Sequence, residues 1–191
     1  MRRVVVSQFV TVDGVMEDPG GSEGFDRGGW AFQFDRGDEG NKFKLDEVFA
    51  SDALLLGRTT YLGFAEAWPS REGEFADKFN NMPKYVVSTT LEEAGWNNSK
   101  LIKGNVAGEV SKLKQEPGGD ILVNGSAKLV HALMENDLID EYRLMVFPVV
   151  LGSGKRLFAD TSDTTTLRLV ESRPVGSEGV LILTYQPSEK E

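Results

Sequence analysis

Apolar residues along this chain follow two patterns, short continuous runs and helical spacing. The runs are rich in Val, Ile and Leu, as is typical of buried strands, and they fall within residues 2–12, 53–56, 83–90, 100–102, 120–123 and 139–147. Apolar residues three or four positions apart predict helices within residues 41–50, 59–64, 106–115 and 126–135. Because strands and helices alternate, the sequence predicts an α/β fold with a mostly parallel central sheet flanked by helices.

The end of the chain departs from this alternation. Two apolar runs within residues 166–186 are separated by a Gly-Ser-Glu-Gly turn and no helix, which predicts an antiparallel hairpin and makes the sheet mixed. A length of 191 residues without a linker or an internal repeat favours a single domain over residues 1–187. Residues 188–191 are expected to form a disordered tail.

One long segment shows neither pattern. Residues 18–40 are dense in Gly, Asp and aromatic residues and show no sustained period, so we expect a long loop there. Structureless loops of this length are usually functional lids or disordered segments. The aromatic side chains of Trp30, Phe32 and Phe34 favour the lid.

The charge balance limits the partners. Acidic residues outnumber basic ones by 30 to 21, which gives a formal net charge of −9. Such a chain repels phosphate backbones and anionic lipids, so neither nucleic acid nor a membrane is expected as a partner. The first ten residues read as a strand and lack a signal-peptide pattern, so a cytoplasmic protein is expected.

Two residue types limit the chemistry. The chain has no cysteine, which excludes disulfides, thiolate zinc sites and cysteine nucleophiles. His131 is the only histidine, so a histidine-based zinc site or a serine triad would rest on a single residue. We therefore expect no metal site.

The stretch "LLLGRTT" places a predicted strand directly before a glycine, an arginine and two hydroxyls. Free N–H groups and the dipole at the start of the following helix favour an anion. Arg58 adds a fork of donors after Gly57, and hydroxyls follow at Thr59 and Thr60. A phosphate site is one interpretation, and a capped helix with a solvated Arg58 is the other.

Two further strand ends repeat this arrangement. The turn of Asn124 and Gly125 is followed by Ser126 at a helix start, and a glycine there would let a pyrophosphate approach the main chain. Ser88 and Thr89 follow a third strand. Each junction alone can be a plain turn, but three together favour one dinucleotide bound along the carboxyl edge of the sheet.

Other polar residues leave their roles open. The glycine-rich stretch "LGSGKRLF" carries Lys155 and Arg156 and fits either an anionic substrate or a basic turn. The carboxylates that could include a proton donor, or could only solvate the surface, are Asp13, Asp38, Glu39, Asp46 and Glu47.

Taken in order, the segments "FVTVDG", "DALLLGRTTY", "YVVST", "ILVNGSAKLV" and "FPVVLGSGKRLF" resemble the dihydrofolate reductase-like superfamily. The similarity is closest to the C-terminal reductase domain of the riboflavin-biosynthesis deaminase/reductase and its stand-alone bacterial relatives. It implies an NADPH-dependent reductase that transfers hydride to a small heterocyclic or ribosylamino substrate, such as 5-amino-6-(5-phosphoribosylamino)uracil. The alternatives are a non-catalytic nucleotide-binding module, a reductase acting on a pterin, and a plain structural or interaction protein that binds no dinucleotide. The resemblance also implies a homodimer.

The resemblance implies roles for the turn residues. Gly57, Arg58, Thr59 and Thr60 match the segment that holds the cofactor phosphates, with Arg58 near the 2'-phosphate. Ser88 and Thr89 match adenosine-phosphate contacts. Asn124, Gly125 and Ser126 stand beside the pyrophosphate, where dihydrofolate reductases carry a Gly-Gly pair from which Asn124 departs. These matches predict the NADPH site.

The substrate side is less defined by the resemblance. Val10, Asp13 and Gly14 match the segment that touches nicotinamide, and Trp30 would lie in the loop over the pocket. Asp46 and Phe147 are further expected substrate-pocket residues. The family's pterin-binding carboxylate falls near Asn41, so folate is not the expected substrate, and no catalytic acid is assigned.

Overall fold

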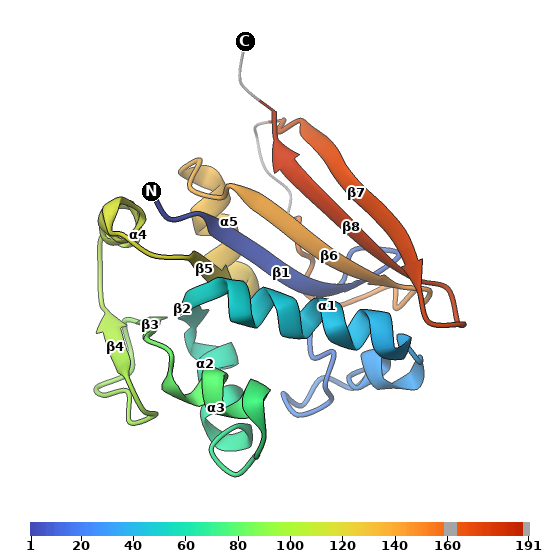
Figure 1. Cartoon of the computed structure of the whole chain (residues 1–191), viewed down its shortest axis with the longest axis horizontal. Coiled ribbons are helices and arrows are strands. Elements are labelled where there is room, and N and C mark those ends of the chain that lie inside the picture. The colour runs from blue at the N-terminus through green and yellow to red at the C-terminus, as the bar shows by residue number, and fades with distance from the viewer. Residues whose placement is uncertain (159–163, 189–191) are drawn as a thin grey trace.

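A computed structural model describes residues 1–158 and 164–188 of the chain, which form one sheet with helices on both faces (Figure 1). The strands are β1 (Val4–Thr11), β2 (Ser51–Gly57), β3 (Lys84–Val87), β4 (Ser99–Ile102), β5 (Asp120–Val123), β6 (Glu141–Phe147), β7 (Leu167–Val175) and β8 (Val180–Pro187). The helices are α1 (Gly37–Ala50), α2 (Arg58–Ala67), α3 (Glu74–Asn81), α4 (Val106–Gln115), α5 (Ala127–Glu135) and the 3-10 helix η1 (Trp30–Gln33).

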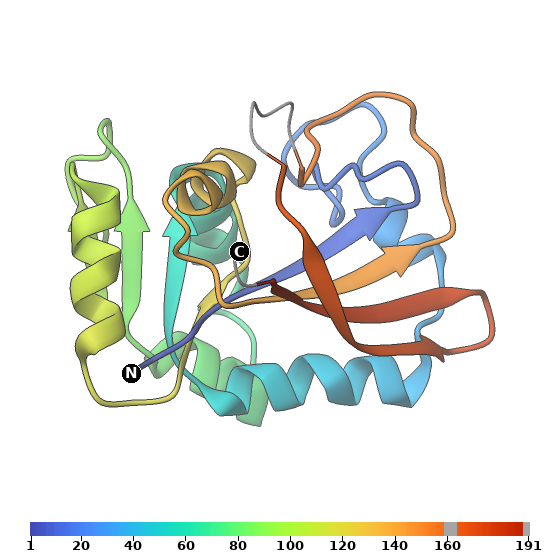
Figure 2. The ribbon, with the colours of Figure 1, turned by 90° about the horizontal axis from the view of Figure 1, so that it is seen from above.

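The strand order is β4-β3-β2-β5-β1-β6-β8-β7. The first six strands in this order are parallel to their neighbours, whereas β8 is antiparallel to β6 and β7 is antiparallel to β8. In Figure 2, α1 and α5 lie on opposite sides of the sheet. The predicted mixed sheet with a C-terminal antiparallel hairpin is confirmed.

Strand β1 shows why the core has two sides. Val4 and Val6 pack with α4 and α5, whereas Val5 packs with α1, α2 and α3, because successive side chains of a strand point to opposite faces. All three valines are fully buried. A third cluster, around Trp30 and Phe147, fills the space between η1 and the C-terminal strands.

The loop prediction for residues 18–40 was too long. Helix α1 begins at Gly37, and η1 occupies four residues in the middle of the segment. Sequence patterns missed this start because the first turn of α1 is "GDEG", which lacks an apolar face. The expected tail at 188–191 lies outside the described residues except for its first position.

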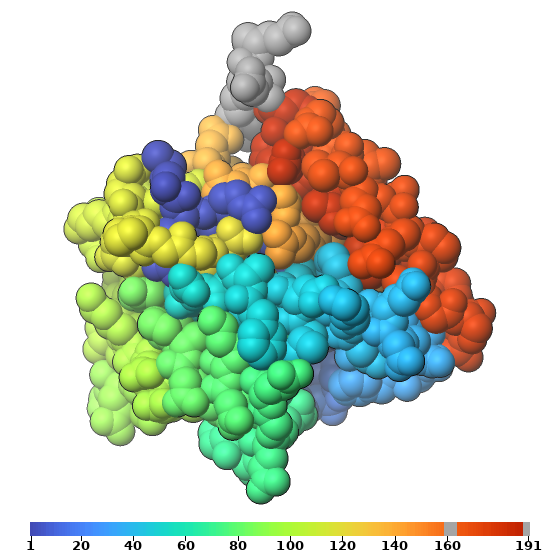
Figure 3. Space-filling model, viewed as in Figure 1, coloured from blue at the N-terminus to red at the C-terminus, as the bar shows by residue number. Residues whose placement is uncertain are grey.

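Helix α3 was not predicted at all. Its sequence, "EFADKFNN", is mostly polar, and only Ala76 and Phe79 are fully buried on it. Phe79 packs with its ring centroid 4.6 Å from that of Trp68 and 5.9 Å from that of Trp96. These partners are distant in sequence, so the helix depends on tertiary packing. Figure 3 shows α1 lying between α3 and the C-terminal strands.

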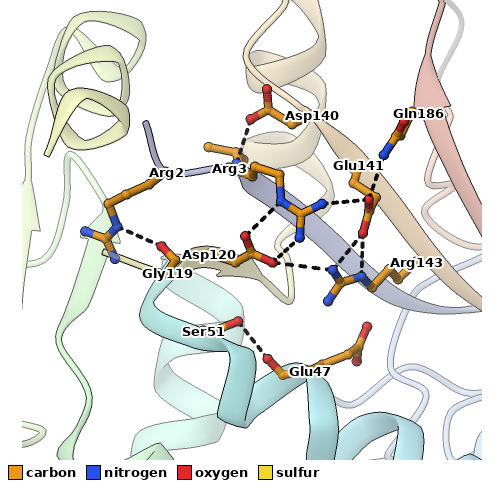
Figure 4. A network of polar contacts seen from close by, with 11 residues as sticks. Arg2, Arg3, Glu47, Ser51, Gly119, Asp120, Asp140, Glu141, Arg143 and Gln186 are labelled. Atoms are coloured by element: carbon orange, nitrogen blue, oxygen red, sulfur yellow. Dashed lines mark hydrogen bonds and ion pairs between the residues drawn. The ribbon is translucent and has the colours of Figure 1, made fainter. Parts of the chain in front are cut away.

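A charged cluster joins the amino ends of β1, β5 and β6 (Figure 4). Arg3 contacts Asp120 at 2.7 Å and Glu141 at 3.0 Å, and Arg143 contacts Glu141 at 2.7 Å and Asp120 at 3.4 Å. Hydrogen bonding to Asp120 raises the pKa of Arg3, and Gln186 and the two arginines lower the pKa of Glu141 against the effect of its burial. The cluster fastens three neighbouring strands together.

Lys84 is a buried cation on the opposite part of the sheet. Its side chain is fully buried, and its Nζ donates to the carbonyls of Asn80, Met82 and Asn97 at 2.8, 2.9 and 3.0 Å. The same nitrogen lies 4.2 Å from the ring centroid of Trp96. Loss of hydration on burial lowers the pKa of Lys84 to about 8.

We expect the free energy of unfolding to rise between about pH 8 and pH 10. In this window the unfolded lysine, with a pKa of about 10.4, still holds the proton that folded Lys84 has lost. Above about pH 10 the trend reverses, because burial raises the pKa of Tyr142 and the unfolded phenol ionises first. Urea unfolding at closely spaced pH values measures both trends. The free energy of unfolding of Lys84→Met should not rise with pH in this window. A rise that persists in this variant would show that another group causes it.

Candidate functional site

The three strand-end turns lie side by side. Strands β3, β2 and β5 are adjacent and parallel, so the turns that follow them emerge at one edge of the sheet. Arg58 Nη1 donates to Thr90 Oγ1 at 3.1 Å, which joins the first turn to the second. The N–H of Gly57 donates to the carbonyl of Gly125 at 2.9 Å, which joins the first turn to the third.

Two glycines allow the first and third turns to interlock. A Cβ on Gly57 would lie 2.2 Å from Ser126 Oγ and 2.8 Å from its backbone nitrogen. A Cβ on Gly125 would lie 2.7 Å from Thr60 Oγ1, and its φ of +118° is one that other residues rarely adopt. The peptide between Gly125 and Ser126 is cis. Only glycine fits both positions without moving the neighbouring turn.

A cleft of about 1,410 Å³ opens at this edge. The turn residues that line it are Gly57, Arg58, Thr59, Thr60, Ser88, Thr89, Thr90, Asn124 and Ser126. Gly125, expected at the cofactor site, is not part of this lining. It continues between α1, α2 and α3, where Phe64, Trp68 and Phe75 form an aromatic wall. Single small-molecule sites usually measure roughly 300–1,000 Å³, so this cleft has room for a second molecule beside a first.

The cleft differs in charge from the chain as a whole. Its described lining includes the basic residues Arg36, Lys42, Lys44, Arg58, Arg71, Lys128 and Lys155 but only the acidic residues Glu17, Asp18, Glu23 and Glu72. The chain has a net charge of −9. A basic cleft in an acidic protein concentrates the field on an anionic ligand.

Strand β1 exposes one edge to the cleft. It pairs with β5 only through Val4, Val5 and Val6, whereas its pairing with β6 continues to Thr11. The cleft is lined by the next residues, Ser7, Gln8 and Phe9. This edge lies beyond the end of β5, directly beside the third turn.

Two polar groups at this edge lack partners among the described residues. Gln8 is buried, and its Nε2 has no acceptor; Asn124 Nδ2 donates to the carbonyl of Ser7 at 3.2 Å, but its Oδ1 has no donor. Buried polar groups are nearly always hydrogen-bonded, so this free donor and free acceptor fit a ligand. The sequence signal for this site is the polar pair Ser7-Gln8 inside an apolar strand.

Helix α1 supplies basic side chains to the same region. Lys44 Nζ lies 2.6 Å from Glu47 Oε2 and 5.3 Å from the ring centroid of Phe9. Arg36, just before the helix, lies 5.2 Å from the same centroid and donates to Asn41 Oδ1 at 2.7 Å. Loss of hydration lowers the pKa of Arg36. Sequence reasoning missed both cations because their setting depends on α1 crossing β1.

Three of the expected substrate-side residues do not line the cleft. Trp30 and Phe147 are each 1% exposed and pack against each other with ring centroids 5.5 Å apart. Asp46 points to solvent and pairs with Lys42 at 2.6 Å. The structure therefore places the two rings in the core and Asp46 on the surface, away from the three turns.

Asp13 and Val10 also lie off the cleft. Asp13 accepts from the backbone N–H groups of Gly152 at 2.8 Å and Leu151 at 3.2 Å, so it holds the loop after β6. A hydrogen bond from Thr11 lowers the pKa of Asp13. Val10 is a buried core residue.

The glycine-rich stretch contributes one residue to the cleft. Lys155 lines it and is paired with Glu17, whereas Arg156 donates to the carbonyl of Asp13 at 2.5 Å. His131 Nε2 contacts the carbonyls of Arg156 and Leu157 at 3.1 and 3.0 Å, which is a structural role. Within residues 1–158 and 164–188, no group of three or more metal-binding side chains comes together, and no helix is long and apolar enough to cross a membrane.

Comparison with known proteins shows which family this chain belongs to. The sequence profile of the RibD C-terminal domain matches residues 2–181. The chain belongs to this family. A full-length relative is the uncharacterized protein YyaP of Bacillus subtilis (strain 168), which is 33% identical over 189 residues covering 96% of this chain and 94% of that protein. The RibD assignment confirms the resemblance seen in the sequence.

Solved structures share the fold of this RibD-type chain. A putative riboflavin biosynthesis protein from Shewanella sp. PV-4 superimposes with a TM-score of 0.78 at 20% identity, covering 98% of this chain and 99% of that one. Dihydrofolate reductase from Enterococcus faecalis, complexed with NADP(H) and RAB-propyl, superimposes with a TM-score of 0.62 at 13% identity, covering 98% and 97%. The fold is therefore dihydrofolate reductase-like.

Proposed function

We propose that this protein is an NADPH-dependent reductase of the riboflavin-biosynthesis type. The observation that carries the proposal is the set of three interlocked turns at one sheet edge, with Arg58 at its outer end. The expected substrate is a small heterocyclic or ribosylamino compound such as 5-amino-6-(5-phosphoribosylamino)uracil. The proposal extends to a cytoplasmic protein acting on a small molecule, and to a homodimer by its family resemblance.

The residues present fit a dinucleotide. Helices α2 and α5 both begin at the turns, and neither has a side chain capping its first N–H groups, so those donors are free for phosphates. Gly57 and Gly125 let the first and third turns approach each other closely, which brings the two helix starts together. When bound, the reduced nicotinamide would supply a hydride.

The chain itself would bind and orient the reactants. Arg58 and the hydroxyls of Thr59 and Ser88 would hold the phosphates, and the free edge of β1 with Gln8 and Asn124 would fix a polar ring substituent. The wider part of the cleft between α1, α2 and α3 would receive the substrate. Orienting two reactants in this way supplies up to roughly 7–11 kcal/mol of a reaction barrier.

Arg58→Gln tests the cofactor assignment. The variant should bind NADPH about 10- to 100-fold more weakly, because a hydrogen bond to a charged group contributes about 1.5–3 kcal/mol. NADH lacks the 2'-phosphate, so its affinity should change less than about threefold. Calorimetric and fluorescence titrations of both cofactors measure the difference.

Arg71→Gln is the matched control. Arg71 lies in the same cleft but at its aromatic end, 4.4 Å from the ring centroid of Trp68. The control should retain the preference for NADPH. If the wild-type protein binds neither dinucleotide, the reductase proposal fails; if it binds NADPH but oxidises it with no substrate, the protein is a nucleotide-binding module without turnover.

A further inference from the structure

Lys44 lies at the wall of the cleft where α1 crosses β1. Its Nζ is 2.6 Å from Glu47 Oε2 and also donates to Ser7 Oγ, and Ser7 Oγ donates to Glu47 Oε2 at 2.9 Å. The side chain of Lys44 is 16% exposed and that of Glu47 is 2% exposed. Lys44 and Ser7 line the cleft, and Glu47 lies behind them.

The hydrogen bonding of this cluster is incomplete. An ammonium group has three N–H donors, and the described contacts of Lys44 use two of them. Glu47 Oε1 is buried and has no donor among the described residues. Lys44 and Glu47 thus each keep one unfilled hydrogen-bonding position, and of the two only Lys44 lines the cleft. The remaining donor of Lys44 is available to a molecule in the cleft.

The cluster stands next to the cofactor turns. Ser7 bonds Lys44 through its side chain, and through its carbonyl it accepts from Asn124 Nδ2 at 3.2 Å. One residue therefore separates the ammonium group from the third turn. Lys44 therefore lines the cleft close to the proposed dinucleotide site.

We propose that Lys44 is the proton donor of the reduction, an assignment that rests on the proposed function. When bound, the reduced cofactor would supply a hydride to the carbon of a C=N or C=O bond, and the π electrons of that bond would move to its nitrogen or oxygen. A Lys44 Nζ–H bond then breaks, and its proton is transferred to that atom, giving an amine or an alcohol. The neutral Lys44 recovers a proton from water. Glu47 and Ser7 are positioning residues that hold Nζ in place.

Glu23 is the competing acid in the cleft. Loss of hydration and the nearby Asp18 carboxylate raise the pKa of Glu23, which favours its protonated form. Its side chain is exposed, however, and no described hydrogen bond fixes its carboxyl group. A proton donor needs a fixed position within hydrogen-bond reach of the reacting atom, so the geometry favours Lys44.

The test compares variants with NADPH and 5-amino-6-(5-phosphoribosylamino)uracil as the probe. Lys44→Met should lose about 10²- to 10⁴-fold in kcat, the usual contribution of general acid catalysis, and its NADPH affinity should stay within about twofold. Lys44→Arg should bind the probe better than Lys44→Met does but should not regain turnover. Added ethylammonium should partly restore the turnover of Lys44→Ala. Lys44→Met leaves the buried Glu47 without its partner, so this variant can be unstable. In that case the double variant K44Q/E47Q replaces it, because both of its side chains are neutral.

Lys112→Met is the matched control. Lys112 forms the same type of pair, 2.6 Å from Glu109 three residues earlier on α4, but its side chain is 72% exposed. This variant should match the wild-type kcat. For the positioning role, Glu47→Gln should lower kcat at an unchanged affinity for NADPH.

Each outcome decides one assignment. If the wild type turns the probe over and both K44M and K44Q/E47Q stay within about threefold, the Lys44 proposal is overturned and the reductase proposal stands. Loss of turnover in Glu23→Gln alone would transfer the role to Glu23. If the wild type binds NADPH without turnover, the affinity of NADP-saturated protein for the probe is measured by calorimetry. A tenfold or larger loss of that affinity in K44M would show that Lys44 contacts the ligand. A smaller loss would overturn the Lys44 proposal.

Discussion

Gly57→Ala is expected to abolish measurable NADPH binding, with an affinity loss of more than about 100-fold, and to destabilise the fold. The added methyl would lie 2.2 Å from Ser126 Oγ and 2.8 Å from a backbone nitrogen that cannot rotate away. Overpacking of this kind costs about 1–3 kcal/mol. The first and third turns must then separate, which breaks the hydrogen bond from Gly57 N–H to the Gly125 carbonyl. Both proposed phosphate-binding helix starts would move apart.

Gly95→Ala is the matched control, at a glycine that does not line the cleft. A Cβ on Gly95 meets nothing within 4 Å, and replacing glycine by alanine where the backbone conformation allows it stabilises a protein by about 0.4–1 kcal/mol. The control should therefore melt at or above the wild-type temperature and keep its NADPH affinity. Calorimetric titration and thermal unfolding of both variants give the comparison. An unchanged affinity in Gly57→Ala would show that the interlocked turns do not form the cofactor site.

Asp120→Ala should lower the free energy of unfolding by about 3–5 kcal/mol. Asp120 is 8% exposed and contacts both Arg3 and Arg143 (Figure 4). Its removal leaves Arg143, whose side chain is 13% exposed, with Glu141 as its remaining ion-pair partner among the described residues. Removing one partner of a buried pair is costly because the remaining charge stays away from water.

Urea unfolding measures this loss, with Glu109→Ala as the control. Glu109 also pairs with a basic side chain, Lys112, but at the surface, where such pairs contribute about 0–1 kcal/mol. Asp120→Asn keeps the shape and removes the charge, so it separates the ionic contribution from packing. Equal stability of Asp120→Ala and Glu109→Ala would contradict a structural role for the charged cluster.

The βαβ unit at residues 120–147 shows what a sequence can predict. Strand β5 and the start of α5 were predicted to within a residue, because a short β-branched run meets an Asn-Gly turn and then an apolar helical pattern. Helix α4 was predicted with its observed bounds. Local patterns decided all three. The three strand-end turns are likewise visible locally, since glycine, hydroxyls and Arg58 follow the strands directly.

The substrate side was beyond such reasoning. The sequence predicts Trp30 and Phe147 as pocket residues, but each packs against the other across more than a hundred residues of the chain. Lys44 and Ser7 escape prediction, because a lysine on a polar helix and a serine in a strand come into contact only when α1 crosses β1. Non-local contacts of this kind have no signature in a single sequence.

The pairing between β1 and β5 is the shortest in the described part of the sheet. Three residue pairs join its two halves there, the charged cluster fastens one end of this joint, and the cleft opens at the other. A ligand that spans the cleft would contact both halves of the sheet at the end of the joint where β1 and β5 are unpaired. The two halves would then unfold as one cooperative unit. Because the ligand binds only the folded state, it raises the free energy of unfolding by an amount that grows with the logarithm of ligand concentration. The melting temperature of this chain would thus report how fully its cleft is occupied.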